Sequence, residues 1–318
     1  MFTDKFSFKF GRQELVYDDA RILGNVNWAQ QARAHDLALF KYEDSFKLHI
    51  GLAYNQEAEN RFGTNYTLPA YKSMQFLWYH RNISKLKFSL LFLNNGMQHD
   101  YIEEGAEKYK TVYSQTLGSR MVLPLQGITA FTEGYYTSGK DAADKNLEAF
   151  MFKVGGSLKL TDALRFHAGW EYLSGTDQTD DPDLDGFTNR SFSPFYGTNH
   201  KFNGHMDYFY VGNHANSVGL SDLYTGLSYE RNQFGANLRS HFFATAAEVI
   251  DAHGEEMDAF LGTEIDLSVS YKLTGPFVVQ AGYSHMLGTS TLQRLKGGDH
   301  RETNNWAWIM LIFNPVFL

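Results

Sequence analysis

The sequence predicts an all-β fold, a transmembrane antiparallel β-barrel of about fourteen strands, and three observations support it. Apolar and polar residues alternate with a period of two along most of the chain. The connections between these alternating segments are short and long in turn. The 318 residues include 26 Phe, 19 Tyr and 5 Trp but only 6 Pro, and aromatic side chains favour strands and the two interfaces of a bilayer.

The alternation is clearest in the segment that begins at Leu164. Apolar side chains at Leu164, Phe166, Ala168, Trp170 and Tyr172 enclose Arg165, His167, Gly169 and Glu171. A strand with this pattern has one apolar face and one polar face. The pattern recurs, and we expect strands near residues 6–14, 33–42, 46–55, 71–81, 86–95, 110–123, 127–137, 147–160, 164–174, 222–230, 234–243, 260–273, 277–286 and 305–317.

The connections are of two kinds. Short turns are expected at residues 43–45, 82–85, 125–126, 161–163, 231–233 and 274–276, and long polar loops near 15–32, 56–70, 96–109, 138–146, 175–221, 244–259 and 287–304. This alternation is typical of an outer-membrane barrel, which has tight periplasmic turns and long external loops. A soluble β-sandwich has no reason to place every long loop at one end, and its outward face should be polar.

Composition excludes several other classes of protein. The longest strongly apolar run, about eight residues from Trp306 to Phe313, is too short for a transmembrane helix, which needs about 20. The absence of cysteine removes disulfide scaffolds, thiol nucleophiles and Cys-ligated metal sites. A net charge of −8 without a long basic run argues against a nucleic-acid partner. We therefore expect a single domain over residues 1–318, located in the outer membrane of a Gram-negative bacterium and surrounded by lipid and lipopolysaccharide.

Two N-terminal stretches and two central ones carry a family resemblance. The stretches are Phe10-Gly-Arg-Gln-Glu-Leu-Val-Tyr-Asp-Asp-Ala-Arg21, Val26-Asn-Trp-Ala-Gln-Gln-Ala-Arg-Ala-His-Asp36, Phe195-Tyr-Gly-Thr-Asn-His-Lys-Phe202 and Met206-Asp-Tyr-Phe-Tyr210. They resemble the Gly-Arg-Gln signature of the alginate export family of outer-membrane porins, in its Bacteroidetes-type version. The resemblance implies an eighteen-stranded barrel, so that about four strands and a signal peptide would precede this sequence. The end Val316-Phe317-Leu318 resembles the C-terminal signal of outer-membrane proteins, although the usual form ends in Phe.

Charged side chains on the inferred inner face are candidates for solute selection. The candidate pore-lining cations are Lys47, Lys87, Lys153, Lys159, Arg165, Arg239 and Lys272, and Arg12 joins them because the resemblance implies a cationic constriction for an anionic polysaccharide. Carboxylates share this face at Glu133, Glu171, Glu230, Glu264 and Asp266. The charges therefore either select anions or form ion pairs across a wide aqueous lumen without selecting anything.

Loop 175–221 is aromatic enough to predict packing against the barrel rather than exposure to water. It is expected to act either as an inward plug that gates the lumen or as a lid on the rim. Asp181, Asp183 and Asp185 within it match the opening of a calcium-binding loop, but position twelve is Phe192 instead of Glu. Calcium is therefore the one cofactor considered, and a solvated acidic loop is the alternative.

The sequence predicts no enzyme, because no Ser lies in a Gly-x-Ser-x-Gly motif and spacing alone does not show that His200, His205 and His214 converge with Asp207. Trp28 and Trp78 are interpreted as part of the aromatic girdle at the bilayer interface. The expected function is an outer-membrane porin for passive passage of solutes, with anionic saccharides or polysaccharide as candidates. The alternative is an outer-membrane enzyme or a surface-binding protein that uses the long external loops.

Overall fold

The computed structural model describes residues 4–28, 32–55 and 71–315. The motif residues 29–31, the expected loop 56–70 and the C-terminal residues 316–318 lie outside the described residues. Fourteen strands form one antiparallel path in chain order, and the two-residue β10 adds to β8 in parallel. The strands are β1 (Phe6–Gln13), β2 (His35–Glu43), β3 (Lys47–Tyr54), β4 (Ser73–Ile83), β5 (Leu86–Glu103), β6 (Ala106–Pro124), β7 (Ile128–Lys140), β8 (Asn146–Lys159), β9 (Leu164–Leu173), β10 (Thr188–Asn189), β11 (Leu220–Arg231), β12 (Phe234–Ala244), β13 (Phe260–Thr274), β14 (Phe277–Gly288) and β15 (Asn304–Phe313).

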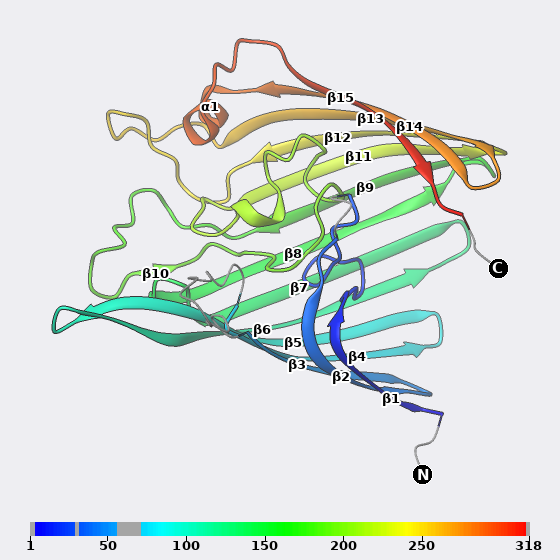
Figure 1. Cartoon of the computed structure of the whole chain (residues 1–318). Helices are drawn as coiled ribbons and strands as arrows, with labels where there is room; N and C mark the ends of the chain where they lie inside the picture. Colours follow the sequence, from blue (N-terminus) through cyan, green and yellow to red (C-terminus); the bar gives the residue numbers. More distant parts are fainter. Residues whose placement is uncertain (1–3, 29–31, 56–70, 316–318) are drawn as a thin grey trace.

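The prediction of an all-β antiparallel barrel fold is confirmed, and each expected strand is present. Short turns lie at one end of the curved sheet and long connections at the other (Figure 1). The expected loop 96–109 is wrong: β5 and β6 pair without a break from Glu103↔Ala106 onward, and only Glu104 and Gly105 turn, both at positive φ. Polar residues on both faces of this projecting hairpin hide its period of two.

Two short helices lie within the long connections. The helix α1 (Ser290–Lys296) occupies part of the expected loop 287–304, and Thr289 caps it by accepting a hydrogen bond from the Leu292 amide. The 3₁₀ helix η1 (Val211–Asn213) lies in the connection between β10 and β11. In the part of the chain that the structure describes, no helix has the length and apolar character needed to cross a membrane.

The outward face carries a continuous apolar row. Its members are cross-strand partners on eight neighbouring strands, namely Phe8, Phe40, Ile50, Leu77, Phe92, Leu117, Tyr136 and Phe150. Each of these side chains is at least 38% exposed. Large apolar side chains exposed in an unbroken row are untenable in water and suit a lipid environment. Above them, Gln115 donates to Asn94 and Asn94 donates to Gln75, so hydrogen-bonded amides border the apolar belt.

The inner face contains glycines that lie beneath aromatic rings. In four cross-strand pairs, an added Cβ on the glycine would come within 2.4 Å of the partner's aromatic side chain: Gly51–Phe76, Gly118–Tyr135, Gly169–Tyr224 and Gly282–Trp308. An aromatic ring folded over a strand glycine covers backbone that would otherwise lack packing. These pairs hold large rings flat against the inner wall and leave space beside them for the inward-folded segments.

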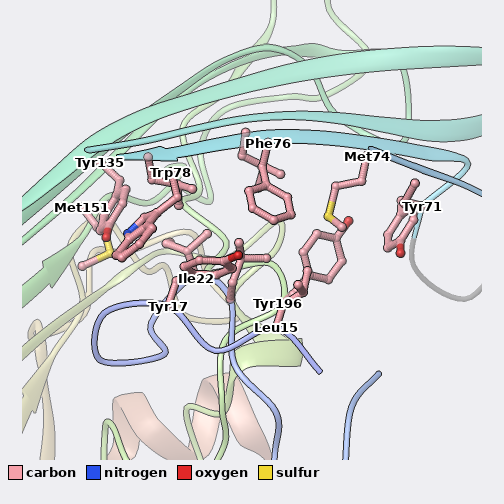
Figure 2. Packing of buried hydrophobic residues seen from close by; sticks show 14 of the residues in the cluster. Leu15, Tyr17, Ile22, Tyr71, Met74, Phe76, Trp78, Tyr135, Met151 and Tyr196 are labelled. Atoms are coloured by element: carbon pink, nitrogen blue, oxygen red, sulfur yellow. The ribbon is translucent and has the colours of Figure 1, made fainter. Parts of the chain in front are cut away.

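Two connections fold inside the curved sheet (Figure 1). We call residues 14–28 the first inward segment and residues 190–218 the second. They bind each other through Gly24 N to Tyr196 O at 2.8 Å and Tyr196 N to Ile22 O at 3.1 Å. Figure 2 shows Tyr17 and Ile22 packed beneath Phe76 and Trp78 of β4. The main hydrophobic core therefore lies inside the barrel wall, between the wall and the two segments.

The first and last strands of the path, β1 and β15, are edges. The pairings among the described residues join β1 only to β2 and β15 only to β14. Unpaired backbone groups cost several kcal/mol each in lipid, so a membrane-embedded channel requires both edges to be paired. The expectation of additional strands stays a prediction, which a longer upstream reading frame would support.

Candidate pore constriction

Charged residues form a row across the middle of the inner wall. Successive cross-strand pairs join Arg120 of β6, Glu133 of β7, Lys153 of β8, Glu171 of β9 and Asp222 of β11. Strand register alone brings them together, because residues of one face recur at every second position. We call these five side chains the charge ladder.

Asp19 of the first inward segment docks on the cationic members of the charge ladder. Its carboxylate lies 3.2 Å from Arg120 Nη1 and 3.7 Å from Lys153 Nζ. Lys201 of the second inward segment donates to the Asp19 carbonyl. Burial opposes ionisation of Asp19, but the cations Lys153, Arg120 and Lys201 outweigh it and hold its pKa below the usual value. Asp19 is therefore ionised at neutral pH and ties both inward segments to the wall.

Arg21 docks on the acidic members of the charge ladder. Its Nη2 donates to Glu171 Oε2 at 2.9 Å and to Asn203 Oδ1 at 3.0 Å, and the side chain is completely buried. Asn203 of the second inward segment also donates to Glu171 at 2.7 Å and to Asp222 at 3.1 Å. The guanidinium lies over the Phe202 ring, 4.8 Å from its centroid. The Asn203 amide therefore connects the second segment to Glu171, the carboxylate that also binds Arg21 of the first.

Asp18 has the opposite electrostatic environment to its neighbour Asp19. It accepts hydrogen bonds from Ser89 Oγ at 2.6 Å and Trp78 Nε1 at 3.1 Å. Burial raises its pKa, and these two bonds offset the shift only in part. The backbone is left-handed at Asp18 (φ 55°) and Ala20 (φ 68°), which is strained for alanine. The docking contacts hold this conformation in place.

The constriction holds charges of both signs. Four cationic side chains, Arg21, Arg120, Lys153 and Lys201, lie among the carboxylates Asp18, Asp19, Glu133, Glu171 and Asp222. Buried charges are costly unless they are paired, and Arg21, Arg120 and Lys153 each pair with at least one of these carboxylates. The sequence predicted no docking role for the first inward segment, which was noted only for its family resemblance. The feature that indicates such a role is the charged run Asp18-Asp19-Ala20-Arg21, which has apolar residues on both sides.

The predicted pore-lining cations do not gather in this constriction. Lys153 alone belongs to the charge ladder. Arg12 shares the strand face of Phe8 and Phe10 and makes a two-point contact with Asp36, through Nε at 3.0 Å and Nη2 at 2.8 Å. The structure therefore places Arg12 at the rim instead of the constriction, because its position in β1 has outward parity.

The remaining predicted cations lie elsewhere on the inner wall. Lys47 pairs with Glu43 at 3.7 Å and Lys159 with Asp162 at 2.6 Å, both near the short turns. Arg165 donates to Ser157 and Arg239 to the Lys201 carbonyl. Lys87 and Lys272 are exposed near the ends of their strands.

A cavity of about 1250 Å³ lies between the second inward segment and the inner wall of β2 to β8. Its charged lining has both signs, with Arg12, Arg33, Lys140, Asp36 and Asp141, and hydroxyl and amide side chains make up half of the rest. One amino group of Arg33 already has a hydrogen-bond partner, because Nη1 donates to the Gly197 carbonyl at 2.7 Å. The constriction and this cavity together define a polar interior of mixed charge.

The three histidines considered as a catalytic or metal group point to different partners. His200 pairs with Asp207 at 3.0 Å, and His205 lies 4.0 Å from Asp266. His214 is bonded to the Phe209 carbonyl at 3.1 Å. The described residues contain no cluster of three or more His, Asp or Glu side chains suited to a metal ion.

The candidate calcium ligands lie on an exposed turn. The Asp181 carboxylate accepts from the Asp183 amide at 2.9 Å, so it caps its own turn. Among the described residues, Asp181, Asp183 and Asp185 included, no three such side chains are grouped to hold a metal ion. Calcium binding therefore stays a prediction, without support from the arrangement of these side chains.

The interpretation of Trp28 and Trp78 as girdle residues is wrong. Trp78 lies on the inner face of β4, is 8% exposed and donates to Asp18. Trp28 packs against Trp308, with ring centroids 4.9 Å apart, beside other inner-wall residues. Both tryptophans therefore pack inside the barrel, whose inner face carries aromatic rings as well as polar side chains.

Comparison with solved structures shows the same fold in outer-membrane proteins. The chain is similar to OccAB4 of Acinetobacter baumannii, with 14% identity, 89% of this chain and 67% of that chain covered, and a TM-score of 0.55. Further matches are OmpT of Vibrio cholerae (13% identity, 85% and 77% covered, TM-score 0.46) and the CymD monoaromatic hydrocarbon channel (10%, 96% and 85%, 0.32). No family model and no curated protein matches the sequence.

The match to OccAB4 confirms the fold, a β-barrel of the kind found in the Gram-negative outer membrane. The alginate export family is not confirmed by any family model. The finer predictions about that family and its solute therefore go beyond what the fold shows.

The prediction that the chain is not an enzyme is corrected. The similarity to OccAB4, at 14% identity, concerns the fold alone and does not restrict the chain to a channel role. A barrel fold does not decide function. The prediction also relied on sequence motifs, whereas the lumen brings His241 within 2.9 Å of Asp222 through strand register alone. The exclusion of catalysis is therefore withdrawn.

Proposed function

We propose that the chain forms an outer-membrane channel for passive passage of polar solutes, and that its two inward segments set the size limit. One observation carries the proposal: the first segment docks on the inner wall through ion pairs, the second through the Asn203 amide, and a cavity of about 1250 Å³ is left beside them. A solute in this interior meets hydroxyl, amide and paired charged groups. Such a lining replaces hydration without binding tightly, as conduction requires.

Saccharides are the solute class that we propose. Their hydroxyl groups match the Ser, Thr and Asn side chains along the cavity, including Ser114, Thr137 and Asn189. The narrower hypothesis of an anionic polysaccharide is supported by the resemblance of the Gly11-Arg12-Gln13 stretch. The constriction does not favour anionic over uncharged sugars, because its cations Arg21, Arg120 and Lys153 already pair with carboxylates.

The size limit is tested by single-channel conductance in planar bilayers. Deleting residues 190–215 removes most of the second inward segment, and we expect a higher conductance than for the wild-type chain. Removing the exposed turn 252–255, which lies in another loop, is the matched control and should leave conductance unchanged. Heat-modifiable mobility in gels verifies that each variant is folded. Equal conductance of the wild type and the 190–215 deletion would refute the size-limit role.

Ion selectivity tests the solute's charge. A salt gradient across the bilayer gives a reversal potential, and preference for anions would support the anionic-polysaccharide hypothesis. Preference for cations would end that hypothesis and leave the channel itself in place. Absence of any conductance by the folded chain would overturn the proposed function.

A further inference from the structure

A second, smaller pocket of about 210 Å³ lies between the inner wall of β12 to β15, the end of the first inward segment and the middle of the second. The wall contributes Asn237, Ser268, Gln280, Trp306 and Trp308. The inward segments contribute Trp28, His200 and His205. At about 30 Å³ per water molecule, the pocket has room for about seven waters or one small ring-shaped solute.

Three of the five tryptophans of the chain meet in this pocket. The Trp28 ring lies 4.9 Å from Trp308 and 6.0 Å from Trp306 between centroids, and is steeply inclined to both. Trp308 is held against the wall by Gly282, since a Cβ there would come 2.4 Å from the indole Nε1. The barrel therefore presents flat aromatic surface on a wall that is otherwise polar.

Hydrogen-bonding groups surround the tryptophans. Asn237 and Ser268 are cross-strand partners on β12 and β13, and Ser268 is in turn the partner of Gly282. Amide and hydroxyl groups from these strands and from Gln280 on β14 line the same pocket. The Nδ1 atom of His200 is buried and has no hydrogen-bond partner among the described residues, so a bound solute can supply one.

The pocket wall lacks permanently charged side chains in the part of the chain that the structure describes. No Lys, Arg, Asp or Glu is among its lining residues. Asp207 and Asp266 lie behind the pocket's histidines, the first paired with His200 and the second near His205. Burial lowers the pKa of His205, so this ring is uncharged at neutral pH. A charged ligand would lose its hydration here without gaining a partner of opposite charge.

We propose that this pocket binds one neutral sugar ring, which stacks its C–H face on the tryptophans and bonds its hydroxyls to the surrounding amides and hydroxyls. A purely apolar ligand would leave those amides unpaired, which is costly in a confined site. A sugar ring has both surfaces that the pocket offers. The inference rests on the proposed channel function and narrows its solute class, because it favours neutral over anionic saccharides at this point of the lumen.

Intrinsic fluorescence of the detergent-solubilised full chain tests the proposal, because most of its tryptophans lie in the pocket. Maltotriose is the neutral probe and trigalacturonic acid the anionic probe of similar size. We expect saturable quenching or shift with maltotriose, and at least tenfold weaker affinity for trigalacturonic acid. Trp308→Ala should weaken maltotriose binding at least tenfold, whereas Trp308→Phe should retain part of it.

Two further variants separate binding from folding. Asn237→Ala removes a hydrogen-bonding group without disturbing the tryptophans, and should weaken binding several-fold. Trp170→Phe changes a tryptophan on the outward face, where it bonds to Ser221, and should leave affinity unchanged. Equal affinity of wild type and Trp308→Ala, or preference for trigalacturonic acid, would overturn the proposal.

Conductance keeps the two proposals distinguishable. A chain that conducts ions but shows no response to maltotriose overturns the sugar site and leaves the channel intact. A chain that binds maltotriose but does not conduct overturns the channel and leaves the pocket.

Discussion

Arg21 donates to Glu171 at 2.9 Å in the interior of the barrel, and both side chains are essentially excluded from solvent. Arg21 lies on a connection between two strands, whereas Glu171 is part of the wall. The pair is therefore a contact between the barrel and the first inward segment, which it holds inside. Breaking such a contact affects the segment before it affects the strands, which have their own backbone hydrogen bonds.

We expect Arg21→Met to release the first inward segment. Removing one partner of a buried ion pair costs about 3–5 kcal/mol, because the other charge is left uncompensated. Hydrogen exchange of residues 14–28 should become faster, while exchange of the strands stays slow. Lys110→Met is the matched control, because its pair with Asp144 lies at the surface and should matter little. Unchanged protection of residues 14–28 would contradict the anchoring role.

Acidification is expected to loosen the second inward segment through His214. Burial lowers its pKa from 6.5 to about 3, and the nearby Arg21 adds to the shift. A depressed folded pKa means that the stability contribution is complete above pH 6.5 and is lost as the pH falls toward 3. Each unit in this window costs about 1.4 kcal/mol, because only the released histidine takes up the proton.

Proteolysis of the 190–218 segment, measured between pH 7 and pH 4, checks this expectation. Cleavage by an acid-tolerant protease should accelerate below pH 6.5 in the wild type. His214→Gln keeps a donor for the Phe209 carbonyl but cannot titrate, so its cleavage should depend less on pH. The same pH profile in both chains would show that other groups control the segment.

A charge placed in the apolar belt should destabilise the membrane-embedded chain. Phe92 is 40% exposed and pairs with Leu77 and Leu117 on the outward face. Phe92→Arg is expected to cost about 2–4 kcal/mol in a bilayer, if this row lies near the midplane. Gln98→Arg, on the same face of β5 beyond the amide row, should cost much less. The free energy of unfolding in urea, measured in lipid vesicles, distinguishes them, and equal costs would argue against this belt facing lipid.

The strands were predictable because their signal is local. Residues such as Phe166 and Arg165 reveal two faces from their positions alone, and short turns mark the strand ends. The hairpin beyond Gly96 escaped prediction because both of its faces are polar outside the apolar belt. Most other strand boundaries agree within three residues, but the expected strand 305–317 ends at Phe313.

The constriction was less predictable, because it depends on contacts distant in sequence. Arg21 and Glu171 are 150 positions apart, and nothing local pairs them. Lys153 was expected on the inner face, and strand parity places it there. Lys153 can select a solute only to the extent that Asp19 leaves its charge available. Asp19 lies on a connection between strands, and no periodic pattern in the sequence predicts the path of that connection. The sequence thus indicated where charges point but not which of them meet.

The glycines beneath aromatic rings give a prediction that separates side-chain from backbone crowding. The three atoms nearest to a Cβ at Gly51 would all belong to the Phe76 ring, the first of them at 2.0 Å. A Cβ at Gly118 would meet the Tyr135 ring at 2.1 Å but also the Gly134 carbonyl oxygen at 2.4 Å. Both alanine substitutions should therefore destabilise the barrel, but for different reasons.

Double-mutant cycles in urea unfolding distinguish the two. Phe76→Leu should relieve much of the cost of Gly51→Ala, giving a favourable coupling of about 1–3 kcal/mol. Tyr135→Leu should relieve less of the cost of Gly118→Ala, because the backbone oxygen of Gly134 cannot move aside without disturbing the β6–β7 pairing. Equal rescue at the two positions would mean that the strands shift easily, and that the rings, instead of the backbone, set the spacing of the wall.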